Sequence, residues 1–137
     1  MYTKLFRLLL YGGALFYIIE GVFHFFGLPI LEHDKIFLPT HDRYIALYAF
    51  TYAALLILIT TDLMKYRALF VIVMIGILLS MFNGWWIAHT GGYSKYFSVK
   101  ELDQGVGWIG IGALGWYSLT WLFWILEWRH LKRTIKT

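Results

Sequence analysis

Four long runs of apolar residues divide the chain, over 8–28, 44–60, 68–88 and 105–128. A helix needs about 20 apolar residues to cross the hydrocarbon core of a bilayer, and about 17 can suffice. The connection 61–67 is short, which favours the second and third runs as antiparallel neighbours. The pattern therefore predicts an all-α integral membrane protein in which residues 1–137 form one domain, a bundle of four transmembrane helices.

Charged residues fall between the runs and predict how the helices are oriented. Positive charges concentrate before the first run, between the second and third, and after the fourth, at Lys4, Arg7, Lys65, Arg67, Arg129, Lys132, Arg133 and Lys136. Most acids fall in the two longer connections, at Glu32, Asp34, Asp42, Glu101 and Asp103. Because cytoplasmic loops carry the excess of Lys and Arg, we expect a multi-pass protein of the cell (inner, cytoplasmic) membrane with both termini in the cytoplasm.

Composition agrees with a lipid environment. Hydrophobic residues make up 60% of the chain and charged residues 15%, against roughly 45–50% and 25% in soluble domains. The absence of cysteine excludes disulfides, thiolate metal sites and Cys nucleophiles. The net charge of +4 lies mainly at the ends of the runs, so we interpret it as a topology signal, with the lipid bilayer and no nucleic acid as partner.

Glu20 lies well inside the first apolar run. A carboxylate at that depth is costly in lipid, so such residues usually face the bundle interior and have a partner. His24 follows at i+4 and Tyr17 precedes at i−3, spacings that place all three on one face of a helix. The first helix is therefore predicted to carry a polar line toward the other helices.

The next two helices carry polar residues that could face this line. His41, Tyr44, Tyr48 and Thr51 share helical spacing on the second helix, and Asn83 and His89 lie toward the outer end of the third. We expect a polar pocket open to the outer face, lined by Glu20, His24, His41, Tyr48, Thr51 and Asn83. Two interpretations stay open: a hydrogen-bonded network that holds the bundle together, or a ligand, proton or metal site.

Two cofactor chemistries fit such a pocket. Imidazole and carboxylate groups suit zinc, copper or iron, with candidate ligands Glu20, His24, His41 and His89. A quinone could instead stack on aromatic rings while an acid or imidazole binds its carbonyl oxygens. The chain contains no Gly-rich phosphate loop, Gly-x-Ser-x-Gly or His-Glu-x-x-His motif, so enzymatic activity stays an open question.

The fourth run begins with closely spaced glycines between Gly105 and Gly115. Glycines allow close helix packing in lipid, so this face indicates a tight contact within the bundle, room for a flat ligand, or a seat for a partner subunit's helix. Farther along, Trp121, Trp124 and Trp128 follow helical spacing and predict an aromatic belt at the cytoplasmic interface.

The segment Glu20-Gly21-Val22-Phe23-His24-Phe25-Phe26-Gly27, the four spans and the Tyr-rich second helix together resemble the DoxX-like group of small four-helix membrane proteins. Some members are membrane subunits of quinone-linked oxidoreductases. The resemblance implies an accessory or ligand-binding subunit of a redox-linked, quinone-associated membrane complex, assembled as a homo-oligomer or within a larger complex. The alternatives are a stand-alone membrane enzyme or binder for a lipophilic small molecule that uses Glu20, His24 and His41, with or without a metal, and a proton or ion pathway.

Overall fold

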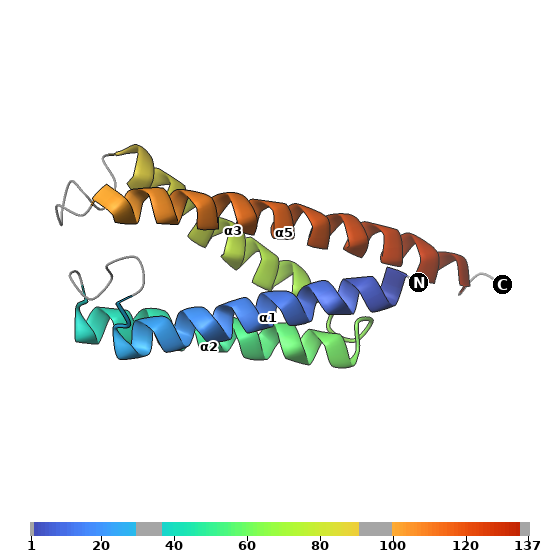
Figure 1. Ribbon diagram of the computed structural model, residues 1–137. Helices are drawn as coiled ribbons and strands as arrows, with labels where there is room; N and C mark the ends of the chain where they lie inside the picture. Colours follow the sequence, from blue (N-terminus) through green and yellow to red (C-terminus); the bar gives the residue numbers. More distant parts are fainter. Residues whose placement is uncertain (1, 30–36, 91–99, 135–137) are drawn as a thin grey trace.

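The computed structural model describes residues 2–29, 37–90 and 100–134. Within these ranges the chain is all-helical, with α1 (Tyr2–Phe26), α2 (Pro39–Thr61), α3 (Arg67–His89) and α5 (Lys100–Thr134) (Figure 1). Each helix contains most or all of one apolar run. Helix α1 begins and α5 ends at the same end of the molecule (Figure 1), which we call the terminal end; the opposite end is the far end.

The helix boundaries at the far end follow from local residue chemistry. Helix α1 stops at Gly27, which has a φ of 60°, a left-handed conformation that glycine adopts readily and that commonly terminates helices. A Cβ atom there would also lie 2.7 Å from Cγ of Phe37. Helix α2 begins at Pro39, whose missing N–H and fixed φ suit the first helical turn.

The short connection between α2 and α3 is closed by Asp62. Its Oδ1 atom accepts the backbone N–H groups of Met64 at 3.1 Å and Lys65 at 3.0 Å. These bonds turn the chain directly after α2 and bring α3 back against it. Helices α2 and α3 are accordingly neighbours in contact.

The buried core occupies the half of the bundle nearer the terminal end. Phe70 of α3 is at its centre, with ring centroids 5.4 Å from Phe6, 5.4 Å from Trp121 and 4.5 Å from Trp124. Trp121 and Trp124 thus pack inward, whereas the sequence predicted an interfacial belt at these positions. The fully or nearly buried apolar side chains around them are Leu10, Ala14, Leu56, Ile59, Val73, Met74 and Ile77.

Helices α1 and α5 meet at a glycine. A Cβ atom on Gly13 would lie 2.2 Å from Cζ2 of Trp116, so the absence of a side chain lets the indole approach the backbone of α1. There the Trp116 Nε1–H donates to the carbonyl oxygen of Leu9 at 2.8 Å. This contact fixes α5 against α1 near the middle of the bundle.

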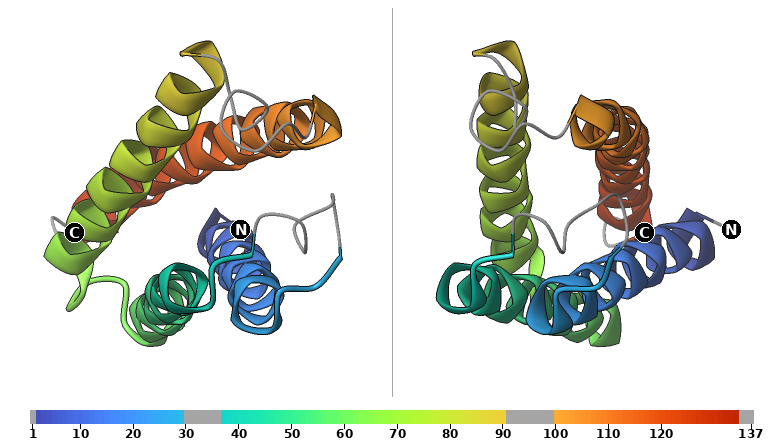
Figure 2. Two further views of the ribbon diagram at one scale, coloured as in Figure 1. Left: turned by 90° about the vertical axis from the view of Figure 1, so that its left-hand side faces the viewer. Right: turned by 60° about the vertical axis from the view of Figure 1, so that its left-hand side comes forward.

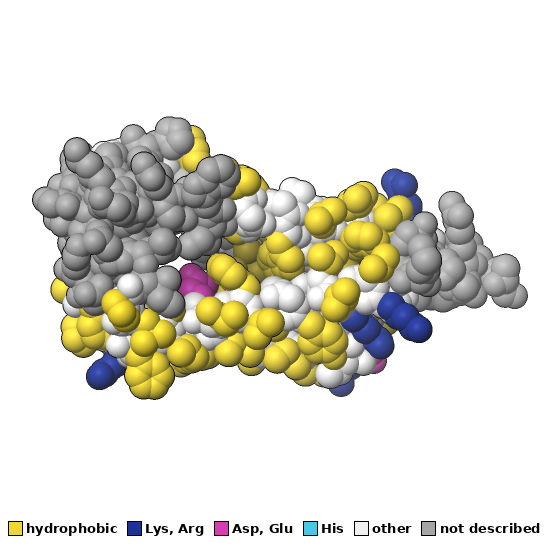
Figure 3. Space-filling model, viewed as in Figure 1, with side chains coloured by type: hydrophobic (Ala, Val, Ile, Leu, Met, Phe, Trp, Pro, Cys, Tyr) yellow, Lys and Arg dark blue, Asp and Glu magenta, His cyan; other side chains and the backbone are white. Residues whose placement is uncertain are grey.

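Toward the far end, α1 and α2 diverge from α3 and α5 (Figure 2). Figure 2 shows α1 and α2 remaining side by side while α3 and α5 move away from them. Small or absent side chains at Gly21, Ala46 and Ala49 keep α1 and α2 close there. Large hydrophobic side chains are exposed on all four helices, and most Lys and Arg side chains visible in Figure 3 gather at the terminal end.

Two helical stretches in the described ranges are long and apolar enough to cross a bilayer, Thr3–Phe26 and Pro39–Thr61. A shorter apolar stretch covers Arg67–Asn83. The structure therefore supports a helical bundle with two candidate membrane spans.

Candidate functional site

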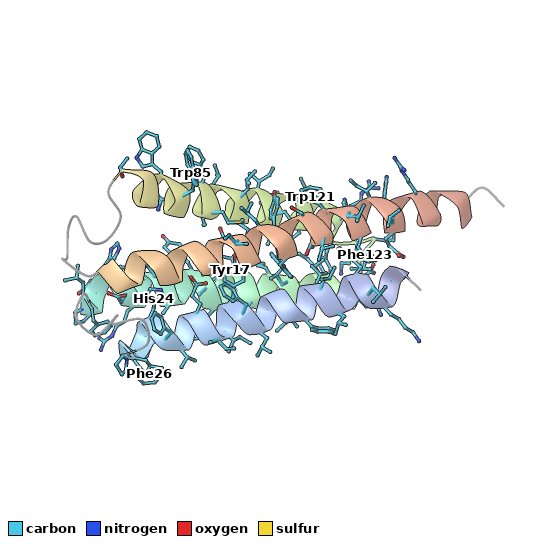
Figure 4. The ribbon with its side chains drawn as sticks, turned by 45° about the horizontal axis from the view of Figure 1, so that its top comes forward. Tyr17, His24, Phe26, Trp85, Trp121 and Phe123 are labelled. Atoms are coloured by element: carbon cyan, nitrogen blue, oxygen red, sulfur yellow. The ribbon has the colours of Figure 1, made fainter. Side chains whose placement is uncertain are left out.

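The polar line expected on α1 lies along its inner face. Tyr17, Glu20 and His24 are all partly buried, while the neighbouring side chains of Ile19 and Val22 are exposed. Figure 4 shows Tyr17 along α1 and His24 farther toward the far end. The inner face of α1 thus changes from apolar in the terminal half to polar in the far half.

His24 contacts a buried carboxylate on α2. Its Nδ1 atom lies 2.9 Å from Oδ1 of Asp42, whose side chain is 4% exposed. The other oxygen of Asp42, Oδ2, accepts the backbone N–H of Leu38 at 2.7 Å. When Asp42 is ionised its carboxylate can only accept hydrogen bonds, and Nδ1 of His24 then carries the hydrogen in this pair. Asp42 thereby orients the imidazole and at the same time satisfies a free N–H group at the start of α2.

Asp42 is not among the site residues predicted from the sequence, because it precedes the second apolar run and was interpreted as a charge of the connection. Asp42 occupies the inner stripe of α2, which continues at helical spacing through Ala46, Ala49 and Ala53, all buried. Its neighbour His41 is exposed, as are Tyr48 and Thr51, so the structure does not bring these three predicted residues to His24. The run of small residues at i+4, i+7 and i+11 from Asp42 is the signal that could have identified the inner face.

Two tyrosines continue the site toward the middle of the bundle. The rings of Tyr17 and Tyr52 have centroids 5.5 Å apart. A Cβ atom on Gly76 of α3 would lie 2.5 Å from the Tyr52 hydroxyl oxygen, so this hydroxyl lies directly against the backbone of α3. Glu20 follows Tyr17 by one turn and lies between this tyrosine contact and His24 along α1.

Two of the predicted residues, Asn83 and His89, belong to the third helix. Asn83 is exposed on α3. His89 is the last residue of α3, and its side chain lies outside the described part of the structure. Among the residues described, no group of three or more His, Asp or Glu side chains could hold a metal ion, so the site as described is an imidazole–carboxylate pair with a second carboxyl group nearby on α1.

A separate groove lies near the far end, at the ends of α1 and α2. It encloses about 410 Å³ and is lined by Phe25, Thr40, Arg43, Tyr44, Leu47 and Phe50. The Arg43 guanidinium lies over the Phe25 ring at 5.6 Å from its centroid, a cation–π contact. None of the residues predicted for the polar pocket lines this groove.

The described site can therefore do two things chemically. An imidazole held in orientation by a carboxylate can make directed hydrogen bonds to a ligand. Placed beside Glu20 in largely apolar surroundings, it can also fix the orientation of a small ligand through a few polar contacts. Comparison of the chain with protein-family models, curated proteins and solved structures finds no match.

Proposed function

We propose that this chain is a multi-pass membrane protein whose four helices all cross the cell membrane, with the terminal end on the cytoplasmic side. The proposal is supported by the large hydrophobic side chains exposed on every helix, since exposed apolar surface of this extent needs lipid or a partner to cover it. The Lys and Arg side chains at the terminal end agree with the positive-inside rule.

Within this membrane protein, we infer that the far half of the bundle binds a lipophilic small molecule. The observation that carries this inference is the His24–Asp42 pair, joined at 2.9 Å with Asp42 almost fully buried. Together with Glu20 it places ionisable groups on the inner faces of α1 and α2, at a depth where such groups are usually functional. The site would be on the outer side of the membrane in the proposed orientation.

A quinone is the ligand class we favour. Its flat ring suits aromatic neighbours such as Tyr17 and Tyr52. Its carbonyl oxygens need hydrogen-bond donors, which a protonated Glu20 carboxyl group and the Nε2–H of a His24 imidazolium, paired through Nδ1 with Asp42, would supply. On this basis the chain would act as an accessory or ligand-binding subunit of a redox-linked membrane complex. A helix of a second copy or of a partner subunit could pack against α5 at Gly110, Gly112 and Gly115. This surface is open, because added Cβ atoms there would meet nothing within 4 Å.

Direct binding tests the ligand proposal. A short-chain quinone would be titrated into the purified protein in mild detergent and followed by isothermal titration calorimetry. We expect saturable binding that His24→Ala weakens by about tenfold or more, because a lost hydrogen bond to a charged group costs about 1.5–3 kcal/mol. The exposed neighbour His41 provides the matched control, and His41→Ala should bind as the wild type does. Equal affinities for all three proteins would overturn the proposal.

A further inference from the structure

A second polar site lies at the terminal end, away from the His24–Asp42 pair. Glu127 of α5 is 2% exposed. It lies in the last turn of the fourth apolar run and is not among the site residues predicted from the sequence. Its Oε1 atom accepts the hydroxyl hydrogen of Thr3. Its Oε2 atom is buried and, within the described residues, has no hydrogen-bond partner.

An unpartnered carboxylate oxygen is costly to bury, so a native structure that contains one calls for an explanation. Glu127 is one wall of a cavity of about 220 Å³, far more than the space that one water molecule needs. Three segments contribute to the lining: the start of α1, the turn after α2, and α5. The lining residues are Thr3, Arg7, Thr61, Asp62, Leu63, Met64 and Glu127.

Several hydrogen-bond donors of the described lining residues are already used by partners within the protein. The Thr3 hydroxyl hydrogen is used by Glu127, and the Thr61 hydroxyl donates to the carbonyl oxygen of Leu58 at 2.7 Å. The N–H groups of Met64 and Lys65 are used by Asp62. Besides the Arg7 guanidinium, the described polar side chains of the lining are two hydroxyls and two carboxyl groups, whose remaining lone pairs suit a compact cation with several N–H donors.

Among the described lining residues, Arg7 supplies the one cationic side chain. Within this described set, two carboxylates against one guanidinium give a net negative charge. A primary ammonium group matches this charge and offers three donors on one atom. A phosphate attached to the same molecule could meet Arg7 and the other basic residues of the terminal end.

We propose that this cavity binds the primary ammonium group of a lipid headgroup or of a small soluble amine, with Glu127 as its counter-ion. In the proposed orientation the cavity opens at the cytoplasmic membrane surface, where both sources are present. The aminophospholipid would present its ammonium group to Glu127 and its phosphate to Arg7. A soluble amine would make only the contact between its ammonium group and Glu127.

Native mass spectrometry of the purified full chain in mild detergent tests the lipid source. The protein would be offered four lipids with identical acyl chains: phosphatidylethanolamine, its N-methyl and N,N-dimethyl forms, and phosphatidylcholine. We expect the wild type to retain phosphatidylethanolamine about tenfold more than phosphatidylcholine, the factor that 1.4 kcal/mol produces. Retention should fall stepwise as N–H groups are replaced by methyl groups. In Glu127→Gln the preference should disappear, while His24→Ala should keep it.

Thermal unfolding tests the soluble source. Ethylammonium chloride should raise the melting temperature of the wild type above that in tetramethylammonium chloride at equal concentration, because only the former has N–H donors. A shift in this arm without a lipid preference would identify a soluble amine as the ligand. The comparison of the four lipids can be made with the wild type alone, so poor folding of a variant would not obscure that result. No lipid preference and no difference between the two salts would overturn the proposal and leave Glu127 as a structural partner of Thr3.

Discussion

His24 of α1 and Asp42 of α2 face each other across the far half of the bundle, with 2.9 Å between Nδ1 and Oδ1. The same carboxylate accepts the backbone N–H of Leu38 just before α2 begins. One buried side chain therefore starts α2, joins it to α1 and orients the imidazole. Changes at Asp42 should consequently affect both the stability of the helix pair and the candidate ligand site.

Replacing Asp42 should destabilise the protein markedly. Asp42→Ala removes a hydrogen bond to His24 and a backbone contact at a helix start, which together are worth about 2–4 kcal/mol. The free energy of unfolding in detergent, measured by denaturant titration, gives the loss directly. The control is His41→Ala, one residue earlier on the exposed face, which should change stability by no more than about 0.5 kcal/mol. Similar losses in both variants would contradict the buried position of Asp42 and the exposed position of His41.

Adjacent glycines on α1 should respond differently to the same substitution. Gly13→Ala places a Cβ atom 2.2 Å from Cζ2 of Trp116, so the indole must move and overpacking should cost about 1–3 kcal/mol. Gly12 has nothing within 4 Å of an added Cβ atom. Gly12→Ala should therefore be neutral or stabilise the helix by up to about 1 kcal/mol. The melting temperatures of the two variants check this, and a Gly13→Ala protein as stable as Gly12→Ala would place Trp116 elsewhere.

The proposed orientation predicts which positions a membrane-impermeant maleimide can reach in intact cells. Because the chain has no cysteine, a single introduced cysteine provides one defined site for the maleimide. Thr40 and Met64 are both exposed, at the far end and at the terminal end respectively. Thr40→Cys should react in intact cells, and Met64→Cys should react only after permeabilisation. The opposite pattern would invert the topology, and labelling of both in intact cells would rule out a spanning α2.

The apolar pattern predicted the four helices but placed their ends imperfectly. The fourth run, 105–128, lies inside α5, which extends from Lys100 to Thr134. A hydropathy pattern marks the stretch suited to lipid, whereas the helix continues through Arg129 and Lys132 because its backbone hydrogen bonds do not depend on side-chain polarity. Similarly, α2 begins at Pro39, before the run that starts at Tyr44.

The sequence predicted the residues that α1 contributes to the candidate site but not their partner on α2. The polar line of Tyr17, Glu20 and His24 was visible because α1 carries few other polar residues. On α2 the choice between His41 and Asp42 depended on which face turns toward α1, and adjacent helical residues differ by about 100°. Polarity does not decide that choice in lipid, where apolar side chains suit the outer surface as well as the core. The register is set instead by the small side chains of Ala46, Ala49 and Ala53, which allow α1 and α2 to pack closely.

If the polar line of α1 and its partner Asp42 hold a ligand, as proposed, that ligand should co-purify with the protein. Native mass spectrometry with elemental analysis, on protein extracted in mild detergent from its own membranes, is the decisive measurement. We predict a co-purifying small organic molecule that is retained by the wild type and by His41→Ala, and lost in Glu20→Gln and His24→Ala. A folded wild type that carries no such molecule, or one retained equally by all four proteins, would contradict the claim and assign the His24–Asp42 pair to holding α1 against α2.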